Sequence, residues 1–278
     1  MTATDDPVLI SYENDINNEN SKFFFETVKR NDWEFQQVGA GDKWEGWVTR
    51  MKAYRDVCSR YDKERILVFT DARDVFCVRY SKAFKAAFEY FNTPIIMSAG
   101  MFLASAIDLP ANFMYKNGAS LEPYFNYWKI QPTLRKFVCA GLMAGRAGAL
   151  YDMWDWMLTN NYIDDQLGAA MYIRTFPEKV KLDLDAILLH SSEYGLDAGI
   201  YHIHMQKQDS PTLAELFGTG AFFLHIPGSG CYKGQKYVYN SIKNILQDIP
   251  SNPIIKEYGK PFPPWNRYKD LPPIKAHP

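Results

Sequence analysis

Cysteine is scarce in this sequence, and its spacing excludes several kinds of site. Only four cysteines occur in 278 residues, Cys58, Cys77, Cys139 and Cys231, and no two of them form a CxxC pair. This spacing argues against a zinc ribbon or a thioredoxin-type centre. We therefore expect reduced, mostly buried thiols in a reducing compartment.

Marks of export, of membrane insertion and of nucleic-acid binding are also missing. Residues 1–7 are polar and acidic, without the basic flank and apolar run of a signal peptide. The most apolar later run, residues 94–109, is too short for a membrane span and contains Asp108. A net charge of −1 without a basic stripe excludes a general nucleic-acid binder. We expect a soluble, cytoplasmic protein, in the host cytoplasm if it is viral.

What the chain does have is an alternation of apolar, strand-like runs with amphipathic helical segments. We predict strands at residues 8–10, 33–38, 65–70, 94–99, 137–143, 186–190, 199–204 and 221–225. We predict helices at residues 21–30, 43–60, 81–90 and 235–246, around 154–156 and from about 164, and an irregular stretch at 110–135. This order predicts an α/β sheet with helices on its faces and ligands at the carboxyl ends of its strands.

The composition changes after residue 248. Eight of the sixteen prolines lie at or after Pro250, which excludes a regular helix or a central strand there. We therefore predict one domain over residues 1–248 and a proline-rich tail over residues 249–278. The tail is compatible with wrapping around the domain, with exchange between the subunits of a homodimer, or with free extension.

Two carboxylates follow the clearest predicted strand. Residues 65–70 lead into Asp71 and Asp74, so the strand delivers both side chains to its carboxyl edge. Hard divalent cations prefer oxygen ligands, and a metal on a diphosphate takes one or two carboxylates from the protein. The alternative is a turn in which the two carboxylates bind backbone amides.

Two later clusters carry similar chemistry. His225 ends a predicted strand and precedes the glycine-rich turn at Gly228 and Gly230, with Lys233 beyond; an imidazole can complete a metal shell and such a turn can approach phosphate. Asp164-Asp165-Gln166 stands near a helix start, where paired carboxylates suit acid–base work or sugar binding. The structural alternatives are a core histidine and a helix N-cap.

In this order the three clusters resemble the glycosyltransferase domain of the procollagen lysyl hydroxylases, and more distantly the collagen galactosyltransferases. The resemblance covers roughly residues 7–245, and its most specific part is Thr70 to Val75. Further matches are Cys139 to Gly145, the Asp-Asp-Gln triplet, His225 to Gly230 with Lys233, and Gly39 to Lys43. It implies a GT-A fold with a mixed, Rossmann-like sheet, a UDP-sugar donor and Mn²⁺, with Mg²⁺ as the alternative.

The resemblance also implies roles for individual residues. Asp71, Asp74 and His225 would bind the metal, and Asp164 and Asp165 would lie near the transferred sugar. The donor-binding positions would be Ser11, Tyr12, Lys43, Thr70, Gly228, Gly230 and Lys233, together with Asp71, which also binds the metal. The acceptor would be a hydroxyl on a glycan or protein, and such a stand-alone enzyme would suit a microbe or a large virus.

Two other readings remain open. A degenerate transferase would bind glycan or nucleotide without turnover. A metal-dependent phosphoryl-transfer enzyme of the haloacid dehalogenase type also places an aspartate after an apolar strand, but it needs carboxylates two residues apart, whereas Asp71 and Asp74 are three apart.

Overall fold

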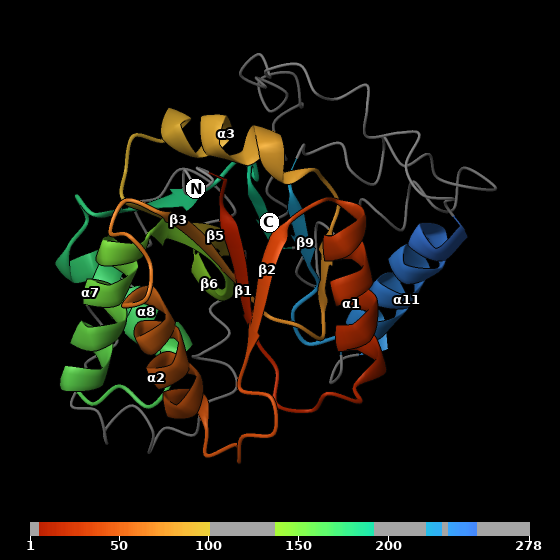
Figure 1. Ribbon diagram of the computed structural model, residues 1–278, viewed down its shortest axis with the longest axis horizontal. Helices are drawn as coiled ribbons and strands as arrows, with labels where there is room; N and C mark the ends of the chain where they lie inside the picture. The colour runs from red at the N-terminus through yellow and green to blue at the C-terminus, as the bar shows by residue number, and fades with distance from the viewer. Residues whose placement is uncertain (1–5, 101–136, 192–220, 230–232, 249–278) are drawn as a thin grey trace, which may run out of the picture.

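A mixed nine-stranded sheet forms the centre of the molecule (Figure 1). The computed structural model describes residues 6–100, 137–191, 221–229 and 233–248. Within these residues the strand order is β2-β1-β3-β6-β5-β8-β9-β4, and β7 pairs with β5. The strands are β1 (Val8–Tyr12), β2 (Glu34–Val38), β3 (Ile66–Thr70), β4 (Val75–Cys77), β5 (Ile95–Gly100), β6 (Phe137–Arg146), β7 (Val180–Asp183), β8 (Leu189–Ser191) and β9 (Phe223–His225).

Strand direction decides which residues share an edge of the sheet. β1 runs parallel to both β2 and β3, so the segments that follow β1 and β3 leave the sheet side by side. β6 lies between β3 and β5 and is antiparallel to both. β4 and β9 form an antiparallel pair in which Val75 faces His225. The carboxyl end of β3 and the end of β9 therefore lie close to the same turn.

Helices cover both faces of the sheet (Figure 1). Helices α2, α7 and α8 lie together on one face, while α1 and α3 pack on the other and α11 lies beside α1. Their bounds are α1 (Glu19–Arg30), α2 (Trp47–Cys58), α3 (Phe84–Tyr90), α7 (Ala147–Thr159), α8 (Asp165–Thr175) and α11 (Lys233–Asp248). A short 3₁₀ helix, Ser81–Ala83, precedes α3.

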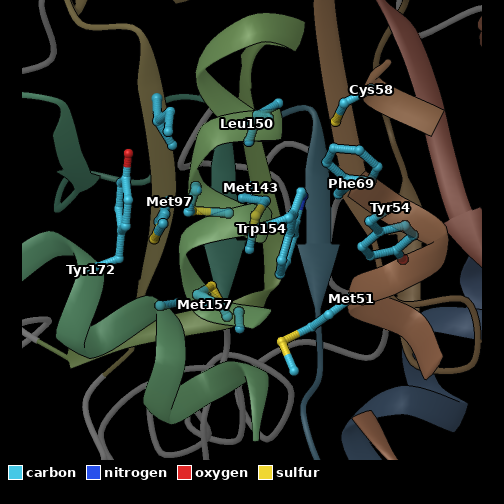
Figure 2. Packing of buried hydrophobic residues seen from close by; sticks show 14 of the residues in the cluster. Met51, Tyr54, Cys58, Phe69, Met97, Met143, Leu150, Trp154, Met157 and Tyr172 are labelled. Atoms are coloured by element: carbon cyan, nitrogen blue, oxygen red, sulfur yellow. The ribbon is translucent and has the colours of Figure 1, made fainter. Parts of the chain in front are cut away.

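The alternation of side chains along each strand builds two cores. In β3, Leu67 and Phe69 face α2 and α7, whereas Ile66 and Val68 face the opposite layer. Figure 2 shows the first core, where Trp154 of α7 lies edge-on to Phe69 and both rings pack near Tyr54 of α2. Because both faces of the sheet are covered, β3 is buried along its whole length, and its first four residues are apolar, as its sequence predicts.

Several element boundaries differ from those that the sequence predicts. The helix predicted at residues 43–60 begins only at Trp47, because Gly46 has a φ of 97°. The strand predicted at 186–190 is shifted to Leu189–Ser191, since the Asp183 carboxylate accepts backbone N–H groups from Ile187 to Leu189 and holds that segment as a turn. The short strands β4 and β7 were not predicted.

The architecture is a curled mixed sheet flanked by helices, consistent with a Rossmann-like GT-A fold. The strand predicted at 199–204, the irregular stretch at 110–135 and the tail at 249–278 lie outside the described residues. Among the helices that the structure describes, none combines the length and the apolar character that crossing a bilayer requires.

Candidate functional site

Asp71, Asp74 and His225 come together at one turn of the sheet. Asp71 directly follows β3, and its backbone N–H donates to the Gly141 carbonyl at 2.8 Å. Asp74 precedes β4, and its carbonyl accepts the N–H of Ile226 at 2.8 Å. The pairing of β4 with β9 therefore brings His225 beside Asp74, although the two are far apart in the sequence.

The three side chains offer ligand atoms that all lie within 4.8 Å of one another. His225 Nε2 is 3.3 Å from Asp74 Oδ1 and 3.6 Å from Asp71 Oδ2. It is buried and makes no hydrogen bond among the described residues, which is unusual for a buried polar atom. Two carboxylates and one imidazole suit a divalent cation, and a cation would satisfy this nitrogen. The residues fit a metal.

Gly141 leaves room for this arrangement. A Cβ at this position would lie 2.3 Å from His225 Cε1 and 2.7 Å from Asp71 Oδ2. Gly141 lies in a part of β6 where the register with β5 shifts. Met97 pairs with Met143, but the next residue of β5, Ser98, pairs with Cys139. Bulges of this kind recur beside functional sites because they redirect the chain.

The charges around the cluster shift its ionisation. Burial raises the pKa of Asp71, and Asp74 and Asp165 raise it further against the opposing effect of Arg50. Burial alone would lower the pKa of His225, but Cys139 and Asp74 raise it well above its usual value. A cation bound at this site would compete with protons for Asp71 and His225.

Arg50 links the metal cluster to Asp165, and sequence reasoning missed it. Its guanidinium pairs with Asp71 Oδ1 and with Asp165 Oδ2, to which Nε donates at 2.8 Å. The Arg50 side chain is 9% exposed and the Asp165 side chain 4%, so this is a buried ion pair. An arginine inside the amphipathic pattern of a helix looks like any surface arginine in the sequence, and only the packing of α2 against β3 and α8 shows its role.

The three side chains of the Asp-Asp-Gln triplet make contacts in three different places. Asp164 is the N-cap of α8, and its Oδ1 accepts the Leu167 N–H at 2.6 Å. Burial raises the pKa of Asp164 to about 6. Asp165 meets Arg50, while the Gln166 side chain bonds the backbone of β6. The N-cap reading of Asp164 is confirmed; a catalytic role for Asp164 or Asp165 stays a prediction.

A cleft of about 510 Å³ opens at the same edge of the sheet. Its wall carries Tyr12, Trp44 and Trp47, whose rings contact one another in sequence at centroid distances of 5.6 and 5.1 Å. Trp44 and Trp47 are each 41% exposed, and the Arg50 guanidinium lies 4.5 Å from the Trp47 ring. The cleft thus joins an aromatic wall to the carboxylates of Asp71 and Asp74.

Glu13 and Arg73 form a second pair that the sequence did not reveal. The buried Glu13 carboxylate accepts from Arg73 Nε and Nη2 at 2.8 and 2.7 Å. Burial alone would raise the pKa of Glu13, but hydrogen bonds from Arg73, Ser21 and the Asp15 N–H lower it overall. The pair connects the loop after β1 to the loop that carries the metal cluster.

The other predicted donor-binding residues are differently placed. Ser11 and Thr70 are buried, and the Thr70 carbonyl accepts from Ser11 Oγ at 2.8 Å and from Tyr54 OH at 3.2 Å. The Lys43 side chain is 87% exposed and pairs with Glu45 at 3.3 Å. Gly228 follows β9 with a φ of 76°. Gly230 lies outside the described residues, and Lys233 is described only as the first residue of α11.

Comparisons with known proteins show likeness in structure only. No family model and no curated protein matches the sequence. A solved glycosyltransferase involved in the glycosylation of the major capsid of PBCV-1 resembles it with a TM-score of 0.47 and 9% identity, over 86% of this chain and 98% of that chain. The 4-diphosphocytidyl-2C-methyl-D-erythritol synthase of Anaerococcus prevotii resembles it with a TM-score of 0.38 and 12% identity, over 63% and 87%. Neither likeness bears on the activity of this chain.

Proposed function

We propose that the protein is a metal-dependent glycosyltransferase that moves a sugar from a UDP-sugar to a hydroxyl of a glycan or protein acceptor. The observation that carries the proposal is the Asp71–Asp74–His225 cluster, whose two aspartates line an aromatic-walled cleft. In this proposal the three residues hold Mn²⁺, with Mg²⁺ as the alternative. When bound, the cation would neutralise the charge of the departing diphosphate as a Lewis acid.

The side chains around the cluster suit separate parts of such a donor. Tyr12 and Trp44 line the cleft with neighbouring rings, which would offer apolar surface to a nucleoside. Arg50 also lines the cleft and pairs with both Asp71 and Asp165, and in the proposal the sugar of the donor lies beside this arginine. In the proposal Asp164, Asp165 and the residues around Gly228 serve the sugar and the phosphates, and the protein works in the cytoplasm, as a homodimer if its tail is exchanged.

Ligand-dependent stability tests the proposal directly. UDP and Mn²⁺ together at about 100 times their dissociation constants should stabilise the native state by about 2.7 kcal/mol. For a domain of this size that raises the melting temperature by roughly 5 °C or more. Asp74→Asn should abolish the shift, whereas Asp62→Asn, on an exposed loop before β3, should leave it intact. A wild-type protein that UDP and Mn²⁺ leave unshifted contradicts the proposal.

One observation favours a second candidate, a nucleotide-binding protein without turnover. Arg50 already pairs with one oxygen of Asp71, which leaves that carboxylate a single oxygen directed toward His225. Mn²⁺-dependent hydrolysis across a set of UDP-sugars separates the two candidates. Turnover with any donor supports the transferase, and a thermal shift without turnover on any donor or acceptor supports the binding protein.

A further inference from the structure

Cys139 lies behind the proposed metal ligand His225. Its Sγ is 3.4 Å from His225 Nδ1, the ring nitrogen that faces away from the two aspartates. Both residues are buried, at 6% and 2% exposure. The imidazole is therefore held between a sulfur atom on one side and the carboxylates of Asp71 and Asp74 on the other.

The backbone around Cys139 is fixed on both sides. Gln166 Oε1 accepts the N–H of Ala140 at 2.7 Å, and Gln166 Nε2 donates to the Val138 carbonyl. Ser98 Oγ donates to the carbonyl of Cys139 itself at 3.0 Å. These bonds lie where β6 departs from its regular register with β5. They determine where the thiol points, because neighbouring residues of a strand face opposite sides of the sheet.

We propose that Cys139 is a positioning residue for the metal site, which orients His225 through Nδ1, and that Gln166 holds Cys139 in place. The inference rests on the proposed function, since it concerns a divalent cation at Asp71, Asp74 and His225. An imidazole that binds a metal through Nε2 carries its proton on Nδ1, and that N–H needs an acceptor. Sulfur is a weak acceptor, and among the described residues Cys139 Sγ is the atom placed to take this bond.

This assignment gives Gln166 a task apart from the sugar. Its amide spans the peptide groups on either side of Cys139, so both of its polar atoms serve β6. Residues that hydrogen-bond the nitrogen of a ligating histidine opposite the metal fix the tautomer and orientation of the ring and raise metal affinity. The third residue of the Asp-Asp-Gln triplet would therefore act on the cation through two intervening side chains.

Titration of the full-length, metal-free protein with Mn²⁺ alone tests the inference. Cys139→Ala should raise the Mn²⁺ dissociation constant about 10-fold or more. Loss of the hydrogen-bond partner of a ligating histidine typically weakens metal affinity about 10- to 100-fold. Cys139→Ser retains an acceptor and should stay within about threefold of wild type. Cys58→Ala, at another buried cysteine, the last residue of α2 and part of the first core, is the matched control and should leave Mn²⁺ affinity unchanged.

A double-mutant cycle shows whether Cys139 acts through His225. In a His225→Ala background, Cys139→Ala should cause no further loss of Mn²⁺ affinity, and Gln166→Met should weaken binding only where His225 is present. Melting of the metal-free variants, compared with Cys58→Ala, separates lost affinity from lost folding.

The outcomes are distinguishable from those of the proposed function. If His225→Ala weakens Mn²⁺ binding and Cys139→Ala does not, the positioning role is overturned and the metal site stands. Equal losses from Cys139→Ala and Cys139→Ser overturn the hydrogen bond as its basis. If the wild-type protein binds no Mn²⁺, or His225→Ala binds it as well as wild type does, the metal site fails and this inference fails with it.

Discussion

At the scale of single residues, the site depends on a glycine, Gly141, and on a buried arginine, Arg50. Gly141 has no Cβ, and that space is taken by His225 and Asp71. Arg50 is buried with two carboxylates, one of which belongs to the metal cluster. Gly141 leaves the space that His225 and Asp71 occupy, and Arg50 holds one oxygen of Asp71. Neither residue would coordinate a cation itself.

We expect Gly141→Ala to destroy the metal cluster. The new methyl group would overlap His225 Cε1 and Asp71 Oδ2; His225 is buried, and Asp71 is held on its other oxygen by Arg50. Overpacking of this kind costs about 1–3 kcal/mol, and Mn²⁺ affinity should fall at least about tenfold. Gly148→Ala is the control, since the nearest atom to its Cβ would be Cβ of exposed Lys63 at 3.1 Å, compared with 2.3 Å to His225 Cε1 for Gly141→Ala. Calorimetric titration with Mn²⁺ and urea denaturation measure both effects. Intact Mn²⁺ binding in Gly141→Ala would contradict the view that the site needs the space left by Gly141.

Removal of the Arg50 charge should expose the cost of its buried partners. Arg50→Met leaves Asp165 and Asp71 without their shared cation and should lower the free energy of unfolding by about 3–5 kcal/mol. Adding Asp165→Asn should restore part of that loss, because it removes the stranded charge. The free energy of unfolding of Arg50→Lys should lie between those of the wild type and Arg50→Met. An ammonium keeps the positive charge but cannot reproduce the hydrogen bonds of a guanidinium. Additive losses in urea denaturation would show that Arg50 and Asp165 are not coupled.

At the scale of elements, the short strands and the helix ends place the chemistry. The β4–β9 pair brings His225 to Asp74, and the start of α8 brings Asp165 to Arg50 and Gln166 to β6. The N-cap Asp164 determines where α8 begins, because its carboxylate accepts the Leu167 N–H. The position of the whole triplet thus follows from one cap.

The cap of α8 should show a distinctive pH dependence. The pKa of Asp164 in the folded protein, about 6, is raised above the unfolded value, so its contribution to stability is present below pH of about 4 and is lost as pH rises through 6. Asp164→Asn keeps the cap without the buried charge, and at pH 7.5 it should stabilise the protein by about 1 kcal/mol or more.

Urea denaturation between pH 4 and 7.5 measures this effect. The advantage of Asp164→Asn over wild type should shrink as pH falls through 6. Asp164→Ala should lose about 1 kcal/mol relative to Asp164→Asn at every pH, because alanine cannot cap the helix. A difference between the asparagine variant and wild type that does not change with pH would contradict the assignment.

At the scale of the whole molecule, helix α11 covers the strands β4 and β9 at the end of the sheet next to the site. Helix α11 packs on β4, β9 and α1 through a third apolar cluster, and Arg30 of α1 donates to the Leu246 carbonyl at 3.0 Å. Tyr239 of α11 is 2% exposed, and its ring stacks on Phe76 of β4 at a centroid distance of 4.7 Å. β4, which follows Asp74, and β9, which ends at His225, are therefore covered by this helix.

Two substitutions at Tyr239 should separate its ring from its hydroxyl. Tyr239→Ala removes the stacked ring and should cost about 3 kcal/mol. Tyr239→Phe should change stability by less than about 1 kcal/mol or raise it, because the buried hydroxyl has no hydrogen-bond partner among the described residues. The midpoints of chemical denaturation measure both, and equal losses would show that the hydroxyl has a partner that matters.

The sequence alone determined the α/β class and most strands and helices, and it placed Asp71, Asp74 and His225 at strand ends as candidate ligands; their grouping as one metal site came from the family resemblance. Local patterns suffice for these features: an apolar run bounded by polar residues is a buried strand, and carboxylates directly after it must lie at its end. Asp71 and Asp74 follow β3 in this way, and His225 ends β9. The start of α2 was misplaced because the conformation of Gly46 is not visible in a helical pattern.

Only the tertiary structure decided what surrounds those ligands. The contacts of Arg50 with Asp165, of Cys139 with His225 and of Glu13 with Arg73 join residues far apart in the chain. They depend on strand order and direction, with β6 antiparallel between β3 and β5 and out of register beside Gly141. Order and register arise from packing across the whole sheet, so a local pattern of side chains carries no record of them.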